Sequence, residues 1–159
     1  MKPRPFRPEP PGDDIRYVRD IEGGLCWHRC ANRILYADTD RSTVVYHANY
    51  LRYFEYGRAS LMRDAAFPYK EIEASGFIYP IIDLGIQFYE PLYYDDPMWI
   101  HTRPAELERV KLRFDYVITH AASGALVCRG FTKHCALNAS GKPTAVDPKT
   151  VRLWKAFPV

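Results

Sequence analysis

The run from Tyr36 to Arg58 brings two carboxylates, an imidazole and the expected start of a helix close together. Asp38 and Asp40 are two residues apart, and His47 follows seven residues after Asp40. A carboxylate can act as a nucleophile or a general base, and an imidazole titrates near neutral pH. Amides at a helix start can hold a developing oxyanion. These residue types in this order suit hydrolysis of an activated acyl group.

A strand before this run and a helix after it must position the reactive groups. Residues 26–36 are moderately apolar and predict a strand that ends at the Asp-Thr-Asp turn. Residues 49–66 predict a helix, because apolar side chains recur there at helical intervals: Tyr50, Phe54, Leu61, Met62 and Ala65. Leu51, Tyr53 and Tyr56 widen the apolar surface, which indicates a helix covered on more than one side.

Four strand-like runs follow the helix, at residues 77–89, 97–106, 111–120 and 124–137, and the last residues predict a short helix or strand. One strand, one long helix and a series of hairpin-connected strands predict an α+β domain with an antiparallel sheet. Such a sheet leaves an edge exposed, and pairing between copies would cover it. We therefore expect a homodimer or a homotetramer.

Length and composition predict one globular domain of 159 residues, 47% of them hydrophobic. Residues 1–20 are Pro-rich and predict an N-terminal arm that is mobile or lies on the surface, and residues 21–159 predict the single domain. The net charge of +3 argues against nucleic acid as the main partner and suits a polyanionic ligand such as coenzyme A. Neither a signal peptide nor a membrane span is expected, so a cytoplasmic location is predicted.

The cysteines allow two interpretations. Together with histidines they make a metal site conceivable, at Cys26, Cys30, Cys128, Cys135, His28 and His134. Reduced cysteines that fill the core or the sheet surface are the favoured interpretation, because the spacing is not that of a compact zinc or redox pair. We therefore expect no metal and no redox cofactor.

Asp38-Thr39-Asp40, followed by Val44-Val45-Tyr46-His47-Ala48-Asn49-Tyr50, resembles a motif of the 4-hydroxybenzoyl-CoA thioesterase family of hotdog-fold proteins. The loop is also similar to that of the Tol–Pal-associated acyl-CoA thioesterase branch, and the resemblance covers roughly residues 27 to 147. It implies a hotdog fold, in which an antiparallel sheet wraps around one long central helix. It also implies an acyl-CoA thioesterase that needs no metal or redox cofactor.

The resemblance assigns roles to the residues of the motif. The catalytic aspartate of the family falls on Asp40, as nucleophile or general base, whereas a turn or capping aspartate is the structural alternative. His47 would polarise the thioester together with the helix N-terminal amide; a capping or loop-anchoring histidine is its alternative. Asp38 is expected to orient the loop. Glu55 is interpreted as structural, with an ion pair to Arg58 possible at this spacing.

Candidate substrate-binding residues flank these groups: Tyr46, Asn49, Tyr50, Arg41, Arg109 and Lys111. Asn49 and Tyr50 also have structural interpretations. Arg109 and Lys111 could hold the phosphates of coenzyme A, as could Arg113, Arg129 and Lys133, although a solvated charged strand face explains them equally well. Aromatic side chains would suit an aryl or short branched acyl group, or else form the core: Tyr46, Tyr50, Tyr53, Phe54, Phe77, Tyr79 and Phe88.

The chain departs from the family at Arg41-Ser42-Thr43, where relatives commonly have small residues and a glycine. Larger side chains restrict the backbone there, and Arg41 would contact an anionic acyl or phosphate group or point to solvent. Hydrolysis of a short-chain or aromatic acyl-CoA is the leading hypothesis. The alternatives are a non-catalytic acyl-CoA-binding hotdog module, a thioesterase acting on acyl carrier protein, and, with little weight, a hotdog dehydratase or a small metal or redox protein.

Overall fold

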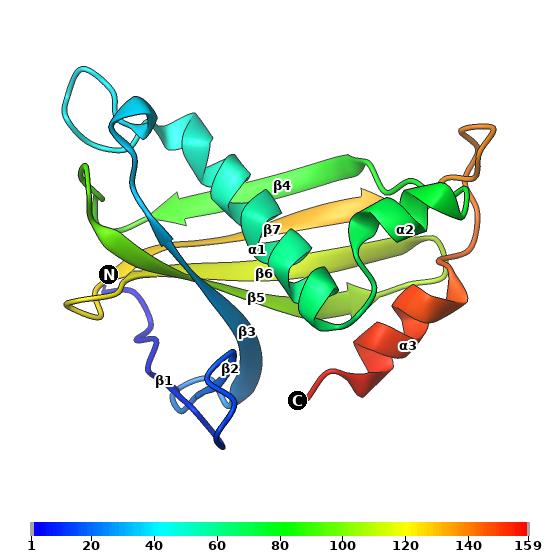
Figure 1. The fold of residues 1–159 in the computed structure, drawn as a ribbon, viewed down its shortest axis with the longest axis horizontal. Coiled ribbons are helices and arrows are strands. Elements are labelled where there is room, and N and C mark those ends of the chain that lie inside the picture. The colour runs from blue at the N-terminus through cyan, green and yellow to red at the C-terminus, as the bar shows by residue number, and fades with distance from the viewer. Residues whose placement is uncertain (1, 159) are drawn as a thin grey trace.

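A long helix, α1 (Tyr50–Asp64), crosses one face of a seven-stranded antiparallel sheet in the computed structural model, which describes residues 2–158 (Figure 1). The strand order is β1-β2-β3-β5-β6-β7-β4. The strands are β1 (Pro8–Glu9), β2 (Tyr17–Asp20), β3 (Leu25–Arg33), β4 (Ile81–Phe88), β5 (Pro97–Leu107), β6 (Lys111–His120) and β7 (Leu126–Cys135). The predicted α+β architecture, with an antiparallel sheet around one long helix, is confirmed.

Helix α1 rests on the sheet along one buried stripe, at Tyr50, Tyr53, Phe54, Gly57, Leu61 and Met62. Gly57 brings the helix close to β5, because a Cβ there would lie 2.5 Å from Thr102 Oγ1 and 2.7 Å from Ile100 Cγ2. Leu51 and Tyr56 are 36% and 45% exposed. The expectation that the helix is covered on more than one side is therefore wrong for the single chain, since the sheet contacts only one face of the helix.

Helix α1 also packs closely on the sheet at Phe54, which is fully buried. Its ring stacks on Tyr116 of β6 with centroids 4.2 Å apart and planes 5° apart. A Cβ on Gly130 of β7 would lie 2.5 Å from Cε2 of Phe54, so the absent side chain makes room for the ring. Phe54 therefore fixes how α1 sits over β6 and β7.

The shorter helices lie beyond the C-terminal end of α1 (Figure 1). The helix predicted over residues 49–66 agrees with α1 to within two residues at its end. A second helix, α2 (Tyr69–Ala74), follows Pro68, and the sequence did not predict it because six residues show too little periodicity. The chain ends in α3 (Pro148–Ala156), where the Asp147 carboxylate accepts from Thr150 N at 2.9 Å. Within residues 2–158 no helix is long and apolar enough to span a membrane.

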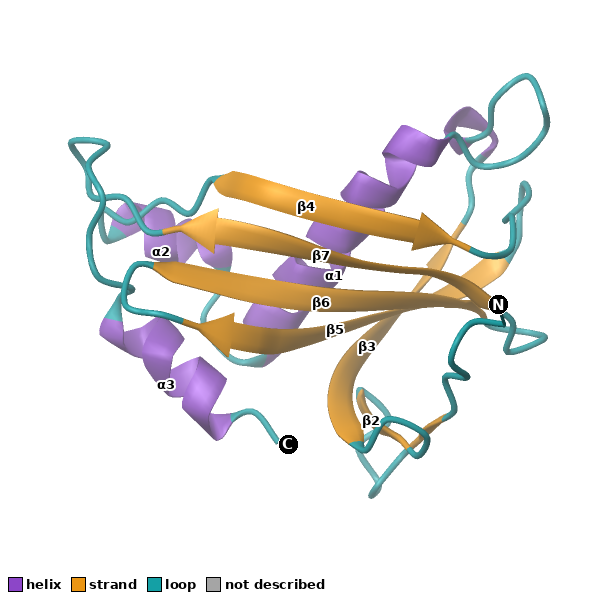
Figure 2. Cartoon of the chain, turned by 180° about the vertical axis from the view of Figure 1, so that it is seen from behind, coloured by secondary structure: helices purple, strands orange, loops and turns teal. Residues whose placement is uncertain are grey.

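The N-terminal segment packs on the sheet. β2 pairs with β3, and β1 pairs with β2. Phe6 and Val18, which are 7% and 0% exposed, form a small cluster with Trp27 and Val117 on the sheet face opposite α1, the face seen in Figure 2. The buried carboxylate of Asp20 accepts from Arg7 N at 2.9 Å and holds the turn. The structure thus adds strands to the sheet before residue 20, while the division of the chain at that residue stays a prediction.

Candidate functional site

The connection between β3 and α1 is a tight loop with Asp40 near its tip. β3 ends at Arg33, earlier than predicted, because the chain turns through a 3-10 helix, η1 (Tyr36–Asp38), before the loop. Asp40 N donates to Val44 O at 2.8 Å, and Thr43 N donates to Asp40 O at 3.0 Å. Val44 also pairs with Tyr93, which follows β4. The backbone of the loop is therefore fixed from both sides.

Within the Arg41-Ser42-Thr43 segment, Thr43 adopts a backbone conformation that glycine favours. Thr43 has a φ of 72°, in the left-handed region that a β-branched residue rarely occupies. Such a residue stores strain of about 1–3 kcal/mol when its surroundings hold it there. The loop thus closes in the glycine-like shape despite the larger side chains.

The Asp40 carboxylate has one oxygen held and one oxygen free. Oδ1 accepts from Ser42 N at 2.7 Å, which fixes the side chain against its own loop. Oδ2 has no hydrogen-bond or ion-pair partner among the residues that the structure describes. Asp40 is half-buried, so this free oxygen is oriented but still accessible. A carboxylate in this state can take a proton from water or attack a carbonyl carbon.

Asp38 anchors the loop to the helix through its carboxylate, as expected. It is 4% exposed, and its Oδ2 accepts from Leu35 N at 3.1 Å and from the Tyr53 hydroxyl at 3.0 Å. Arg52 donates to Oδ1 at 3.3 Å from the solvent side. Burial and the Asp38 carboxylate both raise the pKa of Tyr53, so its hydroxyl stays protonated and donates. The sequence did not predict Tyr53 and Arg52 as the partners of Asp38.

The backbone carbonyl of Asp38 holds the helix start in place. Asn49 Nδ2 donates to Asp38 O at 2.8 Å, and Tyr46 N donates to the same oxygen at 2.9 Å. Asn49 therefore closes the loop, which is the structural role that the sequence left open for it. In the sequence, His47 lies between Tyr46 and Asn49, so both neighbours of its segment are fixed to Asp38 O.

Removing the Asp38 carboxylate is expected to destabilise the protein. Asp38→Ala leaves the Tyr53 hydroxyl and Leu35 N without an acceptor, and each unsatisfied buried donor costs about 1–3 kcal/mol. We expect the free energy of unfolding to fall by about 2–5 kcal/mol, measured by urea denaturation. Asp13→Ala, on the exposed arm, is the matched control. An unfolding free energy equal to that of the control would show that Asp38 does not anchor the loop.

His47 opens the helix and points to solvent. It begins a 3-10 helix, η2 (His47–Asn49), that runs directly into α1, and its side chain is exposed. Its ring packs on Tyr46 with centroids 4.5 Å apart. Among residues 2–158, no hydrogen bond or ion pair joins the His47 ring to Asp40. The first N–H groups of this helix lack intrahelical acceptors and carry partial positive charge, so they add donors beside the imidazole.

Of the aromatic residues predicted to line the site, two are exposed near His47. Tyr46 is 45% exposed, and Phe88, at the end of β4, is 47% exposed. Phe88 packs edge-on against Tyr50 with centroids 5.0 Å apart. Tyr50 itself is buried, with Tyr53, Phe54 and Tyr79, in the core. Tyr46 and Phe88 therefore form the open aromatic surface at the helix start.

The predicted cations lie apart from one another. Arg41 is exposed in the Asp40 loop. Arg109 and Lys111 are exposed at the turn between β5 and β6, which Figure 1 shows at the other end of the sheet from the start of α1. Arg113 donates to Asp115 at 2.7 Å and is already paired. Of these four cations, all within the described residues, Arg41 is the one that the structure places beside Asp40.

The cysteines fill the protein interior. Cys26 and Cys128 are buried, and Cys30 and Cys135 are partly buried. Across the described part of the chain, no group of three or more His, Cys, Asp or Glu side chains is arranged to hold a metal ion. The favoured interpretation of the cysteines agrees with this placement.

Comparisons with known proteins locate this fold and loop in a family. The family model of the thioesterase-like superfamily matches residues 34–154, which include the whole Asp40–His47 loop. The chain belongs to this superfamily. The chain is 34% identical to the Bacillus subtilis protein YneP, over 79% of this chain and 86% of that protein. It is also 28% identical to the Escherichia coli acyl-CoA thioester hydrolase YbgC, over 77% and 92% of the two chains.

Solved structures agree with the family assignment. The DHNA-CoA thioesterase of Staphylococcus aureus superposes with a TM-score of 0.77 and 25% identity, over 81% of this chain and 89% of that one. A protein of Thermus thermophilus superposes with a TM-score of 0.73 and 30% identity, over 80% and 98%. The expected class of enzyme, a thioester hydrolase with the hotdog fold, is confirmed, whereas the Tol–Pal-associated branch stays a prediction.

Proposed function

We propose that this thioesterase hydrolyses a short-chain or aromatic acyl-CoA to a carboxylic acid and free coenzyme A, with Asp40 as the catalytic carboxylate. The observation that carries the proposal is the state of that side chain. Ser42 N fixes one carboxylate oxygen at 2.7 Å, while the other is free and half-buried beside a helix start. A carboxylate fixed in this way loses little freedom when it meets the thioester.

Hydrolysis needs a nucleophile and a polarised carbonyl. As a general base, Asp40 takes a proton from water while the water oxygen attacks the thioester carbon; the C–S bond then breaks and the thiolate takes up the proton. As a nucleophile, the Asp40 carboxylate attacks the thioester carbon and displaces the CoA thiolate, and water then cleaves the mixed anhydride to the carboxylic acid and the free Asp40 carboxylate. His47 and the helix N-terminal amide would stabilise the oxyanion on either route, and one such donor is worth ~10²–10³ in turnover.

The surroundings of Asp40 favour an acyl group with apolar surface. Tyr46 and Phe88 offer exposed rings at the helix start, and Asn49 Nδ2 holds the catalytic loop there through Asp38 O. Tyr50 supports Phe88 from the core. Arg41, exposed in the loop, can meet a phosphate or an anionic acyl group. The names of YbgC and of the Staphylococcus aureus thioesterase support a CoA thioester as the substrate.

A second copy of the chain would complete the site. β4 is the open edge of the sheet, and four of its apolar side chains are exposed by 42–48%: Ile81, Ile82, Leu84 and Phe88. An open apolar edge strand of this length favours pairing with another strand. Two copies paired through β4 would enclose Phe88 and therefore the helix start, and would bring in the partner's side chains. Arg109 and Lys111 remain candidates for the phosphates from that second copy.

A charge on β4 is expected to separate the copies. Leu84→Lys places an ammonium on the pairing surface, and we expect the dimer dissociation constant to rise by about tenfold or more, which corresponds to about 1.4 kcal/mol. Thiol release should fall as the dimer is lost. Sedimentation velocity and activity measured at the same protein concentration test this, with Ile15→Lys, 63% exposed on the arm, as the control. A Leu84→Lys dimer as tight as the control dimer would contradict pairing through β4.

Two alternatives to CoA thioester hydrolysis are distinguishable in solution. The Arg41-Ser42-Thr43 loop, with Thr43 in a glycine-like conformation, favours a non-catalytic acyl-CoA-binding module if it prevents attack. An acyl carrier protein thioester is the other candidate substrate, because the basic excess of the chain suits an acidic carrier.

A panel of acyl-CoAs, followed by free-thiol release, tests the proposal. Short straight-chain, branched and aromatic thioesters are compared at equal concentration with the purified chain. Release of CoA from one class would support hydrolysis and name the acyl group. Binding to the panel without release would support the binding module. Thiol release only from acylated carrier protein would identify the carrier protein, not CoA, as the thiol of the substrate.

A further inference from the structure

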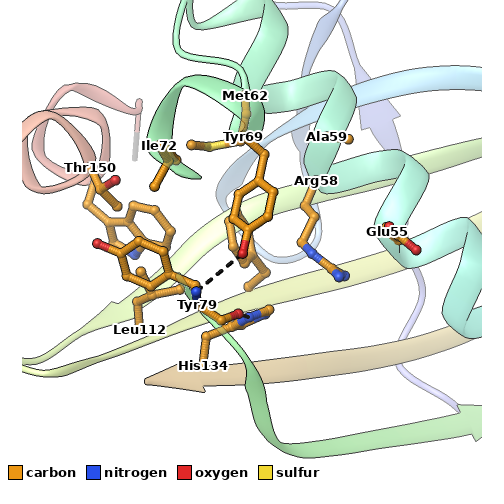
Figure 3. Close-up of a pocket in the computed structure, with 12 residues that line it drawn as sticks. Glu55, Arg58, Ala59, Met62, Tyr69, Ile72, Tyr79, Leu112, His134 and Thr150 are labelled. Atoms are coloured by element: carbon orange, nitrogen blue, oxygen red, sulfur yellow. Dashed lines mark hydrogen bonds between the residues drawn. The ribbon is translucent and has the colours of Figure 1, made fainter. Parts of the chain in front are cut away.

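A cavity of about 130 Å³ lies beneath α1, lined by the residues that Figure 3 shows. No residue of the Asp40 loop lines it. Arg58 and Met62 line it from α1, Tyr69 from α2, Phe114 from β6 and Trp154 from α3. Most of the wall is apolar. None of these side chains belongs to the proposed catalytic machinery, so the few polar groups in the wall indicate what the cavity can hold.

His134, on the inner wall, is neutral and has both ring nitrogens occupied. Burial lowers the pKa of His134 to about 4. Its Nδ1 lies 2.9 Å from the carbonyl oxygen of Tyr79, which can only accept, so Nδ1 carries the proton and donates. Nε2 then accepts, and the Thr132 hydroxyl donates to it at 2.8 Å. The ring has no donor or acceptor left for a ligand.

The direction of the next hydrogen bonds follows from His134. The Thr132 proton is directed at His134, so the Tyr116 hydroxyl donates to Thr132 Oγ1 at 2.7 Å. The oxygen of Tyr116 accepts from an Arg58 N–H at 3.3 Å. This series of hydrogen bonds therefore starts at the Arg58 guanidinium and ends at the backbone carbonyl of Tyr79. On this wall of the cavity, Arg58 still has N–H groups that can donate hydrogen bonds to a ligand.

The spare polar groups around the cavity are donors. Arg58 is half-buried, and no carboxylate of the described residues lies within ion-pair distance of it. The Tyr69 hydroxyl accepts from Tyr79 N at 3.2 Å and keeps its own proton for donation. A ligand that satisfies these groups must supply acceptors.

We propose that this cavity binds a small apolar carboxylate, with the carboxylate paired to Arg58 and the apolar part enclosed between α1, α2 and α3. The size fits, because an apolar cavity of about 150 Å³ accepts benzene. The charge fits too, since a guanidinium pairs with a carboxylate through two parallel hydrogen bonds. Such a ligand has two sources: a free acid, or the far end of an acyl group derived from a dicarboxylic acid. The second source rests on the proposed thioesterase activity, and the first does not.

The carboxylate of Glu55 repels a bound carboxylate, so a change at Glu55 gives a second test of the proposal. It lines the mouth of the cavity three residues before Arg58, where its side chain is exposed (Figure 3). It forms no ion pair with Arg58 among the described residues. Its negative charge weakens binding of a carboxylate, so removing that charge should strengthen binding.

Calorimetric titration with benzoate, and with benzamide as its neutral isostere, tests the site. We expect the wild-type chain to bind benzoate at least tenfold more tightly than benzamide, and Arg58→Met to remove this preference. Glu55→Gln should bind benzoate several-fold more tightly. Equal affinity of the wild type for benzoate and benzamide, or an unchanged preference in a folded Arg58→Met, would overturn the proposal.

Two further measurements cover misfolding of Arg58→Met and the source of the ligand. Tyr69→Phe keeps the ring and removes its hydroxyl, and it should weaken benzoate binding several-fold; unchanged binding by a folded Tyr69→Phe together with unchanged binding by Glu55→Gln would count against the site. Adipyl-CoA and hexanoyl-CoA then separate the sources. Preference for adipyl-CoA that Arg58→Met abolishes indicates an acyl group, whereas benzoate binding without that preference indicates a free acid. Because benzoate binding needs no turnover, it succeeds or fails independently of thioester hydrolysis.

Discussion

Replacing Asp40 by Asn is expected to reduce free-thiol release by ~10²–10⁴-fold while leaving the fold intact. The asparagine amide oxygen can still accept from Ser42 N, which the carboxylate meets at 2.7 Å, so the loop keeps its shape. A neutral amide cannot take a proton from water, and it is a poor nucleophile. Initial rates with the best acyl-CoA, measured alongside circular dichroism, check both parts of this expectation.

The kinetic pattern of Asp40→Asn matters as much as its size. A loss confined to kcat, with KM unchanged, is expected for a group that acts on the transition state. Asp13→Asn removes the same charge on the exposed arm and should retain full activity. Turnover of Asp40→Asn within threefold of that control would remove Asp40 from the chemistry. The catalytic carboxylate would then have to be sought elsewhere, Glu55 first.

Phe54→Ala is expected to lower the free energy of unfolding by about 3–5 kcal/mol, the usual range for a fully buried aromatic side chain. The ring stacks on Tyr116 and occupies the space above Gly130, so its loss leaves a cavity between α1 and β7. For a chain of this length, the melting temperature should fall by roughly 6–20 °C. Thermal unfolding followed by circular dichroism measures the effect.

Tyr56→Ala is the matched control for Phe54→Ala. It removes a similar ring two positions along the same helix, but from a side chain that is 45% exposed. We expect its unfolding free energy to change by less than about 0.5 kcal/mol, as for most surface substitutions. Equal losses for the two variants would mean that the exposed side of α1 is covered in solution.

The sequence predicted the parts of the fold that rest on regular spacing. The apolar interval in the long helix and the alternation in the strands repeat over many residues, so α1 and the strands β4 to β7 were found. The helix at Tyr69–Ala74 was missed because it is shorter than two full turns. The strands β1 and β2 were missed because they are short and have few apolar residues. The burial of Val18 in β2 depends on Phe6 and Trp27, which come from other parts of the chain.

The candidate site was only partly visible in the sequence. Asp40, His47 and the anchoring role of Asp38 lie in one short segment, where local spacing carries information. The sequence could not tell which aromatic rings are exposed, because Tyr50 and Tyr46 look alike without the sheet that buries one of them. The chain of hydrogen bonds from Arg58 to Tyr79 joins four separate elements, and only the fold brings them together.

The short strands at the start of the chain make the two edges of the sheet unequal. At one side the sheet tapers into β2 and the two-residue strand β1, and at the other it presents the eight residues of β4. In the language of polymer chemistry, pairing through β4, as we propose, would make the chain a monofunctional monomer, with one edge that pairs and one edge closed by β1. A monofunctional unit couples once and stops, whereas a bifunctional unit grows into fibres. The N-terminal segment would then act as a chain terminator. It would allow β4 to pair with a second copy while preventing open-ended assembly from the other edge of the sheet.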